Sequence, residues 1–232
     1  MRQKDKQIFY EKQYAKGETA GPVWYQALSS FTTTREDVAI KLLQKQKTYG
    51  KILLDLGCGE GYLLRKLSLN FKQLIGTDIA RNRIKLARKK SKKNKNIIYK
   101  IADLDLPLPF NSKSIDAVTC LSVMEYVFDP NSFIKEVHRV LKKNGLLIIS
   151  VPNLAYLPER IKLLFGILPS WPDAIGWQGG RLHTFTFKSL TNLLEENDFK
   201  VIRKTGSGFL QPVRNLWPEI LSGDCHILAR KK

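Results

Sequence analysis

The sequence contains little cysteine and no long hydrophobic run, and each shortage excludes a class of protein. Its 232 residues include three cysteines, Cys58, Cys120 and Cys225, which lie far apart without paired spacing. This pattern provides neither a disulfide framework nor a zinc site, so we expect no bound metal and a reducing, cytoplasmic location. The longest apolar run, residues 146–149, is much shorter than the roughly 20 residues of a membrane-spanning helix. No targeting segment is expected at the start of the chain, which is charged.

Acidic residues are absent from one strongly basic segment. The chain has 39 Lys and Arg against 21 Asp and Glu, a net charge of +18. Residues 81–100 include ten basic and no acidic residues, so this segment supplies +10 and the rest of the chain +8. A general nucleic-acid-binding surface would spread its excess charge along a whole face. We therefore interpret the segment as a solvated helix surface and expect no stable nucleic-acid or membrane partner, although residues 81–95 leave a weak anionic partner open.

Short apolar runs alternate with amphipathic helical stretches from about residue 51, which predicts an α/β fold with a parallel sheet. Strands are expected at 52–56, 74–78, 97–102, 115–121 and 146–151. The clearest helix begins after Asp129, which can cap it, and has Pro130 in its first turn. Its apolar positions repeat at helical spacing, and Lys142, Lys143 and Gly145 predict its end.

The most informative segment is Asp55-Leu56-Gly57-Cys58-Gly59-Glu60-Gly61. Alternate glycines after a buried strand allow a sharp turn, expose main-chain N–H groups and direct a helix N-terminus at a ligand. Asp78 ends the next strand, where a carboxylate can accept hydrogen bonds from both ribose hydroxyls, and Asp103 ends the strand after that. All three strand ends are expected at the sheet edge where open α/β folds bind ligands.

This pattern resembles the first motif of the class I S-adenosylmethionine-dependent methyltransferases, an acidic residue followed by three alternate glycines. The resemblance continues through Gly76-Thr77-Asp78-Ile79, Ile101-Ala102-Asp103-Leu104 and the segment 116–127, and it spans about residues 50–152. It implies a Rossmann-like, mostly parallel sheet of seven strands with helices on both faces and a helical N-terminal cover. It also implies that S-adenosylmethionine binds at Asp55, Gly57, Cys58, Gly59, Gly61, Asp78, Ile79, Asp103, Leu104 and Leu121.

Within that superfamily the chain is most similar to the small-molecule methyltransferases of the ubiquinone-biosynthesis and methionine-biosynthesis-protein-W type. Many members have Glu-His after the fourth strand, whereas this chain has Glu125-Tyr126. We therefore expect an enzyme that transfers a methyl group directly, in line, to a small molecule. His183 is the candidate catalytic base, because imidazole titrates near neutrality, with a structural histidine as the alternative.

The resemblance divides the expected single domain, residues 1–232, into four parts. Residues 1–45 form the helical cover, 50–152 the cofactor-binding core, 153–186 a substrate-covering insertion, and 187–232 a helix with antiparallel strands. Two other functions stay open: an RNA or protein methyltransferase that docks through the basic helix, and a non-catalytic module that binds S-adenosylmethionine. The glycine spacing disfavours a dinucleotide-dependent oxidoreductase, because the third glycine is one residue too early for its fingerprint.

Overall fold

A seven-stranded sheet forms the centre of the computed structural model, which describes residues 7–11, 32–46, 50–169 and 181–232. Its strand order is β4-β3-β2-β5-β6-β9-β7. Strands β2 to β6 pair in parallel, and β9 runs antiparallel to its neighbours β6 and β7. The bounds are β2 Ile52–Leu56, β3 Gln73–Asp78, β4 Ile97–Ile101, β5 Ile115–Leu121, β6 Leu141–Pro152, β7 Phe199–Thr205 and β9 Asp224–Lys231. The expected mostly parallel sheet is confirmed.

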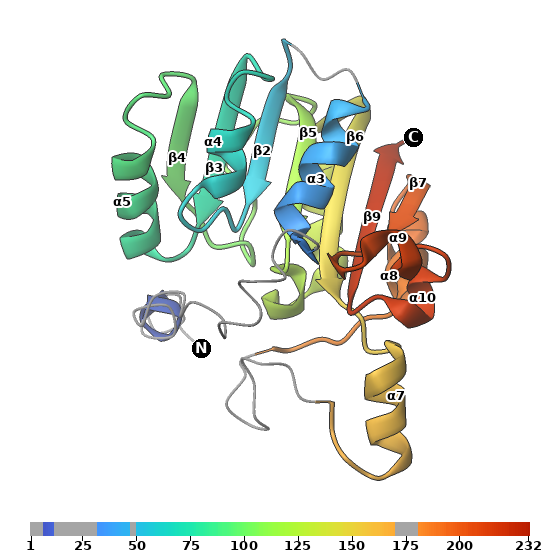
Figure 1. Ribbon diagram of the computed structural model, residues 1–232. Coiled ribbons are helices and arrows are strands. Elements are labelled where there is room, and N and C mark those ends of the chain that lie inside the picture. Colours follow the sequence, from blue (N-terminus) through green and yellow to red (C-terminus); the bar gives the residue numbers. More distant parts are fainter. Residues whose placement is uncertain (1–6, 12–31, 47–49, 170–180) are drawn as a thin grey trace.

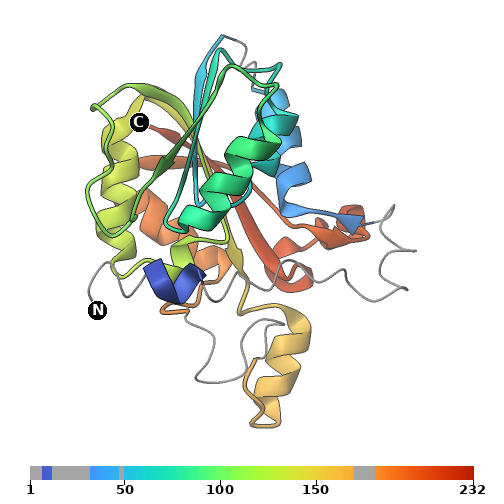
Figure 2. The same ribbon diagram turned by 90° about the vertical axis from the view of Figure 1, so that its left-hand side faces the viewer.

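Helices cover both faces of this sheet (Figures 1 and 2). One face packs against α3 (Arg35–Gln44), α4 (Tyr62–Lys66) and α5 (Arg81–Lys90), and the other against α6 (Pro130–Val140) and α8 (Phe187–Glu196). Because both faces are covered, successive strand residues such as Leu53 and Leu54 are both fully buried. This explains why the strands read as continuous apolar runs in the sequence.

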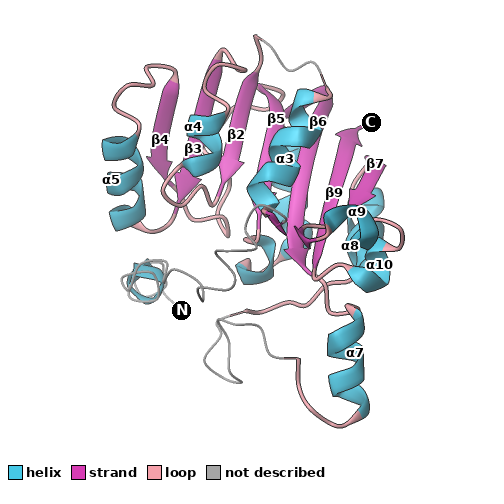
Figure 3. Ribbon diagram, viewed as in Figure 1, coloured by secondary structure: helices cyan, strands magenta, loops and turns pink. Residues whose placement is uncertain are grey.

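The remaining elements lie near the carboxyl ends of the parallel strands, as Figure 3 shows for α7. They are the turn η2 (Met124–Tyr126), α7 (Leu157–Leu164), α9 (Gln211–Arg214), α10 (Pro218–Leu221) and a small antiparallel pair, β1 (Thr32–Thr33) with β8 (Gly208–Phe209). A short helix at residues 7–11 lies at the same edge. No helix in the described part of the chain is long and apolar enough to span a membrane.

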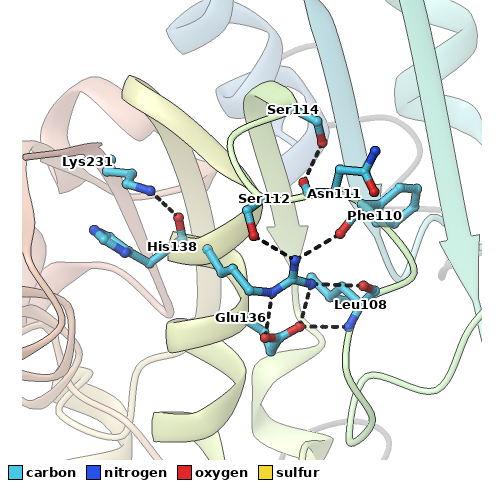
Figure 4. Close-up of polar contacts among 9 residues, drawn as sticks. Leu108, Phe110, Asn111, Ser112, Ser114, Glu136, His138 and Lys231 are labelled. Carbon is cyan, nitrogen blue, oxygen red and sulfur yellow. Dashed lines mark hydrogen bonds and ion pairs between the residues drawn. The ribbon is translucent and has the colours of Figure 1, made fainter.

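The end of α6 was predicted wrongly. Asp129 caps the helix as expected, accepting hydrogen bonds from the N–H groups of Asn131 and Ser132, but the helix ends at Val140 instead of Lys143. Strand β6 begins at once, because Leu141 pairs with Ile115 of β5. The ammonium of Lys231, from the last strand, donates to the carbonyl oxygen of His138 (Figure 4) and also to that of Leu141. These tertiary contacts satisfy carbonyls at the helix end and are invisible to a local pattern.

Arg139 of α6 connects this helix to the loop between β4 and β5, and Figure 4 labels its partners Glu136, Leu108 and Phe110. Arg139 donates to the carboxylate of Glu136 at 2.8 Å and to the carbonyl oxygens of Leu108 and Phe110 at 3.0 and 2.9 Å. Glu136 in turn accepts a hydrogen bond from the Leu108 N–H at 2.8 Å. The guanidinium thereby fixes the loop that follows Asp103 and Leu104.

The first and third expected parts of the domain, the cover and the insertion, lie partly outside the described residues. Residues 1–6 and 12–31 of the proposed cover are not among the described residues, nor are residues 170–180 of the proposed insertion. Of the described residues in the cover, those of α3 pack into the sheet core through Val38, Ala39, Leu42 and Leu43. Thus α3 is a helix of the α/β layer itself.

Candidate functional site

The glycine-rich segment forms a tight turn between β2 and α4. Gly57, Gly59 and Gly61 all have positive φ angles, 73°, 51° and 74°, which residues with a side chain rarely adopt. The N–H groups of Gly57 and Cys58 both donate to the carbonyl oxygen of Thr77 in β3, each at 2.8 Å. The turn is therefore tied to the neighbouring strand.

Two of these glycines also lie where a side chain would not fit. A Cβ atom added to Gly57 would be 2.2 Å from Cγ2 of Val123, and one added to Gly61 would be 2.1 Å from the hydroxyl oxygen of Tyr99. The neighbours come from the turn after β5 and from β4, respectively. The absence of side chains lets the loop pack between three strand ends while its backbone remains close to any ligand above it.

Asp78 connects the second expected strand end to this loop. Its carboxylate accepts hydrogen bonds from the N–H groups of Gly59 and Ala80, each at 2.9 Å. Burial raises the pKa of this carboxyl, and the two backbone hydrogen bonds oppose that rise. Because a carboxylate offers about four lone-pair sites, two remain to accept hydroxyl groups. The donor set therefore fits the ribose of an adenosyl cofactor.

Asp55 lies beneath the loop instead of at its surface. Its side chain is 4% exposed, and one oxygen accepts a 2.7 Å hydrogen bond from the Thr119 hydroxyl of β5. Burial raises the pKa of Asp55 to about 7, against the lowering effect of the Thr119 hydrogen bond. Asp55 thus links the end of β2, just before the loop, to β5 through its buried side chain.

The other expected cofactor residues surround the same edge. Ala102 donates from its N–H to the Asp78 carbonyl oxygen at 3.1 Å, which brings Asp103 beside β3. Asp103 accepts a 3.1 Å hydrogen bond from the Asp105 N–H. Cys58 is buried, and Ile79, Leu104 and Leu121 are half-buried. Leu104 lines a cavity of about 190 Å³ with Leu106, Pro107 and Phe128 among others.

The basic helix α5, which the sequence analysis interprets as a solvated surface, meets the glycine loop. Lys90 of α5 forms an ion pair with Glu60, the residue between Gly59 and Gly61. A guanidinium nitrogen of Arg83 lies 2.9 Å from the position that a Cβ of Gly59 would occupy. The other basic residues in the last turn of α5, Arg88 and Lys89, are exposed.

Three histidines have different surroundings. His183 directs Nε2 to the Phe128 carbonyl oxygen at 3.2 Å, and because a carbonyl only accepts, this nitrogen carries a proton. His226 is fully buried in β9, and burial lowers its pKa to about 4, as expected for a structural residue. His138 is half-buried with its ring edge against Phe199, and burial lowers its pKa.

Sequence reasoning missed one candidate residue, Glu125 of η2. It is 1% exposed and lines a small pocket together with Arg181, His183 and Phe185 among others. A charged residue within the otherwise apolar segment Val123-Met124-Glu125-Tyr126-Val127 was the available signal. Arg181, His183 and Phe185 are more than 50 residues away from Glu125 in the chain, so the sequence did not reveal the grouping.

Comparisons with known proteins agree with this geometry. A family model described as "Methyltransferase domain" matches residues 54–149. A curated Coxiella burnetii protein named "Ubiquinone biosynthesis O-methyltransferase" is 31% identical over 139 residues, 57% of this chain and 59% of that protein. A protein of the same name from Pelagibacter ubique is 35% identical over 102 residues, 44% of this chain and 42% of that protein. The chain thus spans about half the length of these curated relatives.

Solved structures share the fold at low sequence identity. The magnesium protoporphyrin IX methyltransferase of Synechocystis, crystallised with bound S-adenosylhomocysteine, superposes with a TM-score of 0.68 at 17% identity, covering 97% of this chain and 94% of that one. An S-adenosylmethionine-dependent methyltransferase from Mesorhizobium loti gives a TM-score of 0.65 at 19% identity, covering 85% and 98%. At such identities the similarity establishes the fold alone.

Proposed function

We propose that residues 54–149, which match a family model described as "Methyltransferase domain", form a class I S-adenosylmethionine-dependent methyltransferase domain, and that the chain transfers a methyl group from S-adenosylmethionine to a hydroxyl oxygen of a small molecule. The observation that carries the proposal is the hydrogen bond from the Gly59 N–H to the Asp78 carboxylate. It joins the glycine turn and the acidic strand end into one cradle, as the resemblance of both motifs implies.

The cofactor supplies a methyl group that its sulfonium makes reactive without further activation. The chain's own residues then have to bind the cofactor, orient the methyl acceptor and exclude water from the site. Asp78 accepts the ribose hydroxyls, and the backbone of Gly57 to Gly61 contacts the part of the cofactor nearest the loop. Asp103 and Leu104 would hold the adenine ring, and Leu121 would pack against the cofactor, as the resemblance implies.

The choice of a small hydroxyl-bearing acceptor rests on the curated relatives, which are named O-methyltransferases. No feature of the described residues favours a nucleic acid or a protein as the acceptor over a small molecule. The exposed lysines of α5 are available to solvent, and Lys90, the one that meets the loop, is already paired with Glu60.

A methyl-transfer assay tests this proposal. The protein is incubated with S-adenosylmethionine labelled in its methyl group and with fractions of an extract from the source cell. We expect label in the small-molecule fraction, bound through an ether oxygen. Label found exclusively in RNA or protein would replace the proposed acceptor class, and binding of the cofactor without any transfer would favour a non-catalytic module.

A further inference from the structure

Arg83 differs from the other basic residues of α5. Its side chain is half-buried, whereas the other five basic residues of this helix are exposed. It also stands in the first turn, three residues after the N-cap Ala80, and this turn contains no acidic residue. A cation at that end opposes the helix dipole, which is positive there, so helix formation gives no reason for an arginine. Residues that break such a local rule are expected mainly at functional sites.

The guanidinium of Arg83 lies against the glycine turn where the turn is linked to Asp78. Its Nη1 atom is 2.9 Å from the position that a Cβ atom of Gly59 would occupy, and its Cζ atom is 3.9 Å from it. The N–H of Gly59 donates to one oxygen of Asp78, and the N–H of Ala80 donates to the other, each at 2.9 Å. The Asp78 carboxylate therefore lies between Gly59 and the first turn of α5, and Arg83 extends from that turn to Gly59.

Most of the other ionisable groups around Asp78 are acidic. The titratable and charged groups on the surrounding elements are Asp55 of β2, Cys58 and Glu60 of the turn, Arg65 of α4, Tyr99 of β4, Asp103 after β4 and Glu11 of the helix at residues 7–11. Lys90 pairs with the Glu60 carboxylate, and Arg65 donates to the Glu60 carbonyl oxygen. These two cations therefore act on Glu60, whereas the charge of Arg83 acts on Asp78.

Opposing effects set the protonation of Asp78. Burial raises the pKa of its carboxyl, and the N–H groups of Ala80 and Gly59 and the charge of Arg83 lower it. Besides burial, the charge of Asp78 contributes to the raised pKa of Asp55, so the two carboxylates repel each other. Without Arg83, backbone hydrogen bonds alone would oppose these unfavourable effects on an ionised Asp78.

We propose that Arg83 is a positioning residue for the cofactor, because its guanidinium supplies the positive charge that keeps Asp78 a carboxylate while the ribose hydroxyls bind to it. This rests on the proposed cofactor cradle and adds a residue that lies outside the recognisable motifs. A carboxylate accepts hydrogen bonds from both hydroxyls, and such charge-assisted bonds are roughly twice as strong as neutral ones. A protonated Asp78 carries a hydrogen on one oxygen and binds the two hydroxyls less well.

The test compares the parent protein with Arg83→Gln, Arg83→Met and Arg83→Lys. Lys85→Gln is the matched control, because Lys85 is an exposed cation of the same helix and its loss changes the net charge by the same amount. Titration of the Asp78 carboxyl is followed by NMR in the protein without cofactor, and Asp78→Asn identifies its signal. The Kd of S-adenosylhomocysteine is measured by calorimetry at about pH 8 and about pH 5.

We expect the Asp78 carboxyl to titrate at a higher pH in Arg83→Gln and Arg83→Met than in the parent, because an adjacent positive charge opposes protonation. The ratio of variant to parent Kd should be near one at the higher pH and rise to about fivefold at the lower pH, the effect of a partly exposed charge pair. Asp55 titrates in all these proteins, so its contribution cancels in the ratio. Arg83→Lys should restore most of the parent's behaviour, and Lys85→Gln should match the parent.

Two results would overturn the proposal. One is an Asp78 titration that is the same in the parent and in the neutral variants. The other is a Kd ratio that stays constant with pH or that Lys85→Gln reproduces. Arg83→Met retains the apolar part of the side chain and serves if Arg83→Gln does not fold. Failure of the parent to bind S-adenosylhomocysteine would instead contradict the proposed function, and the NMR titration, which needs no cofactor, would still decide the role of Arg83.

Discussion

The N–H of Gly59 donates to the carboxylate of Asp78 at 2.9 Å. These residues are 19 positions apart and belong to the two motifs that the sequence singled out separately. The bond makes the acidic strand end part of the glycine turn. Asp78 therefore both shapes the loop and offers acceptors to a ligand.

Replacing Asp78 by alanine should weaken S-adenosylhomocysteine binding by roughly 1.5–3 kcal/mol, because charge-assisted hydrogen bonds to the ribose hydroxyls are lost. Asp78→Asn keeps one acceptor oxygen and should lose less. Calorimetric titration measures both affinities, and Asp116→Asn serves as the control. An unchanged affinity in Asp78→Ala would reduce Asp78 to a turn residue.

Alanine at Gly57 should damage the site more than alanine at a glycine with the same backbone angle elsewhere. Gly50 has a φ of 74°, and no atom of the described residues lies within 4 Å of its Cβ position, so Gly50→Ala should cost roughly 1–2 kcal/mol of stability from strain alone. Gly57→Ala adds the overlap with Val123 and should cost more and weaken cofactor binding. Chemical denaturation and calorimetry compare them; equal losses would show that the turn tolerates a side chain.

Stability of the unliganded protein should depend on the ionisation of Glu125. Its pKa rises from 4.5 to about 7 on folding, so the folded state binds a proton more tightly than the unfolded one. The resulting stability is fully present below pH 4.5 and is lost as the pH rises to 7. Glu125→Gln removes this loss, and its stability relative to the parent should increase by on the order of 3 kcal/mol between pH 4.5 and 8. Urea denaturation at several pH values measures the difference; parallel curves would place the carboxyl in contact with water.

The exposed charges of α5 should have little influence on cofactor binding. Replacing Lys89 of α5 and Lys92 and Lys93 of the turn that follows it by glutamine should leave the affinity for S-adenosylhomocysteine unchanged. Lys90→Gln breaks the partly exposed ion pair with Glu60 and should change that affinity by less than about 1 kcal/mol. A gel shift with RNA is the complementary measurement, and tight, salt-sensitive binding that the triple variant abolishes would instead identify α5 as a docking surface.

The sequence pattern predicted those parts of the fold that depend on interactions between residues close together in the chain. The apolar strands, the glycine turn and the Asp129 cap depend on neighbouring residues, so they were found in the right places. The end of α6 depends on Lys231, which lies about 90 residues away, and it was predicted three residues too late. No periodic pattern contains information about such a partner.

The candidate site was predicted at its glycine turn and missed at Glu125. Gly59 and Asp78 belong to segments with recognisable spacing, whereas Glu125 lies in a three-residue turn with none. Its partners Arg181 and His183 come from a segment that reaches the turn only through the tertiary hydrogen bonds to the Glu125 carbonyl. This grouping of side chains is visible only in three dimensions.

The central claim, that the glycine turn and Asp78 hold an adenosyl cofactor, is tested most directly by calorimetric titration of the parent protein with S-adenosylhomocysteine and, separately, with NAD. We predict binding of one equivalent of S-adenosylhomocysteine, a matching stabilisation of about 2.7 kcal/mol at a hundredfold excess over Kd, and no binding of NAD. Binding of NAD without binding of S-adenosylhomocysteine would contradict the account.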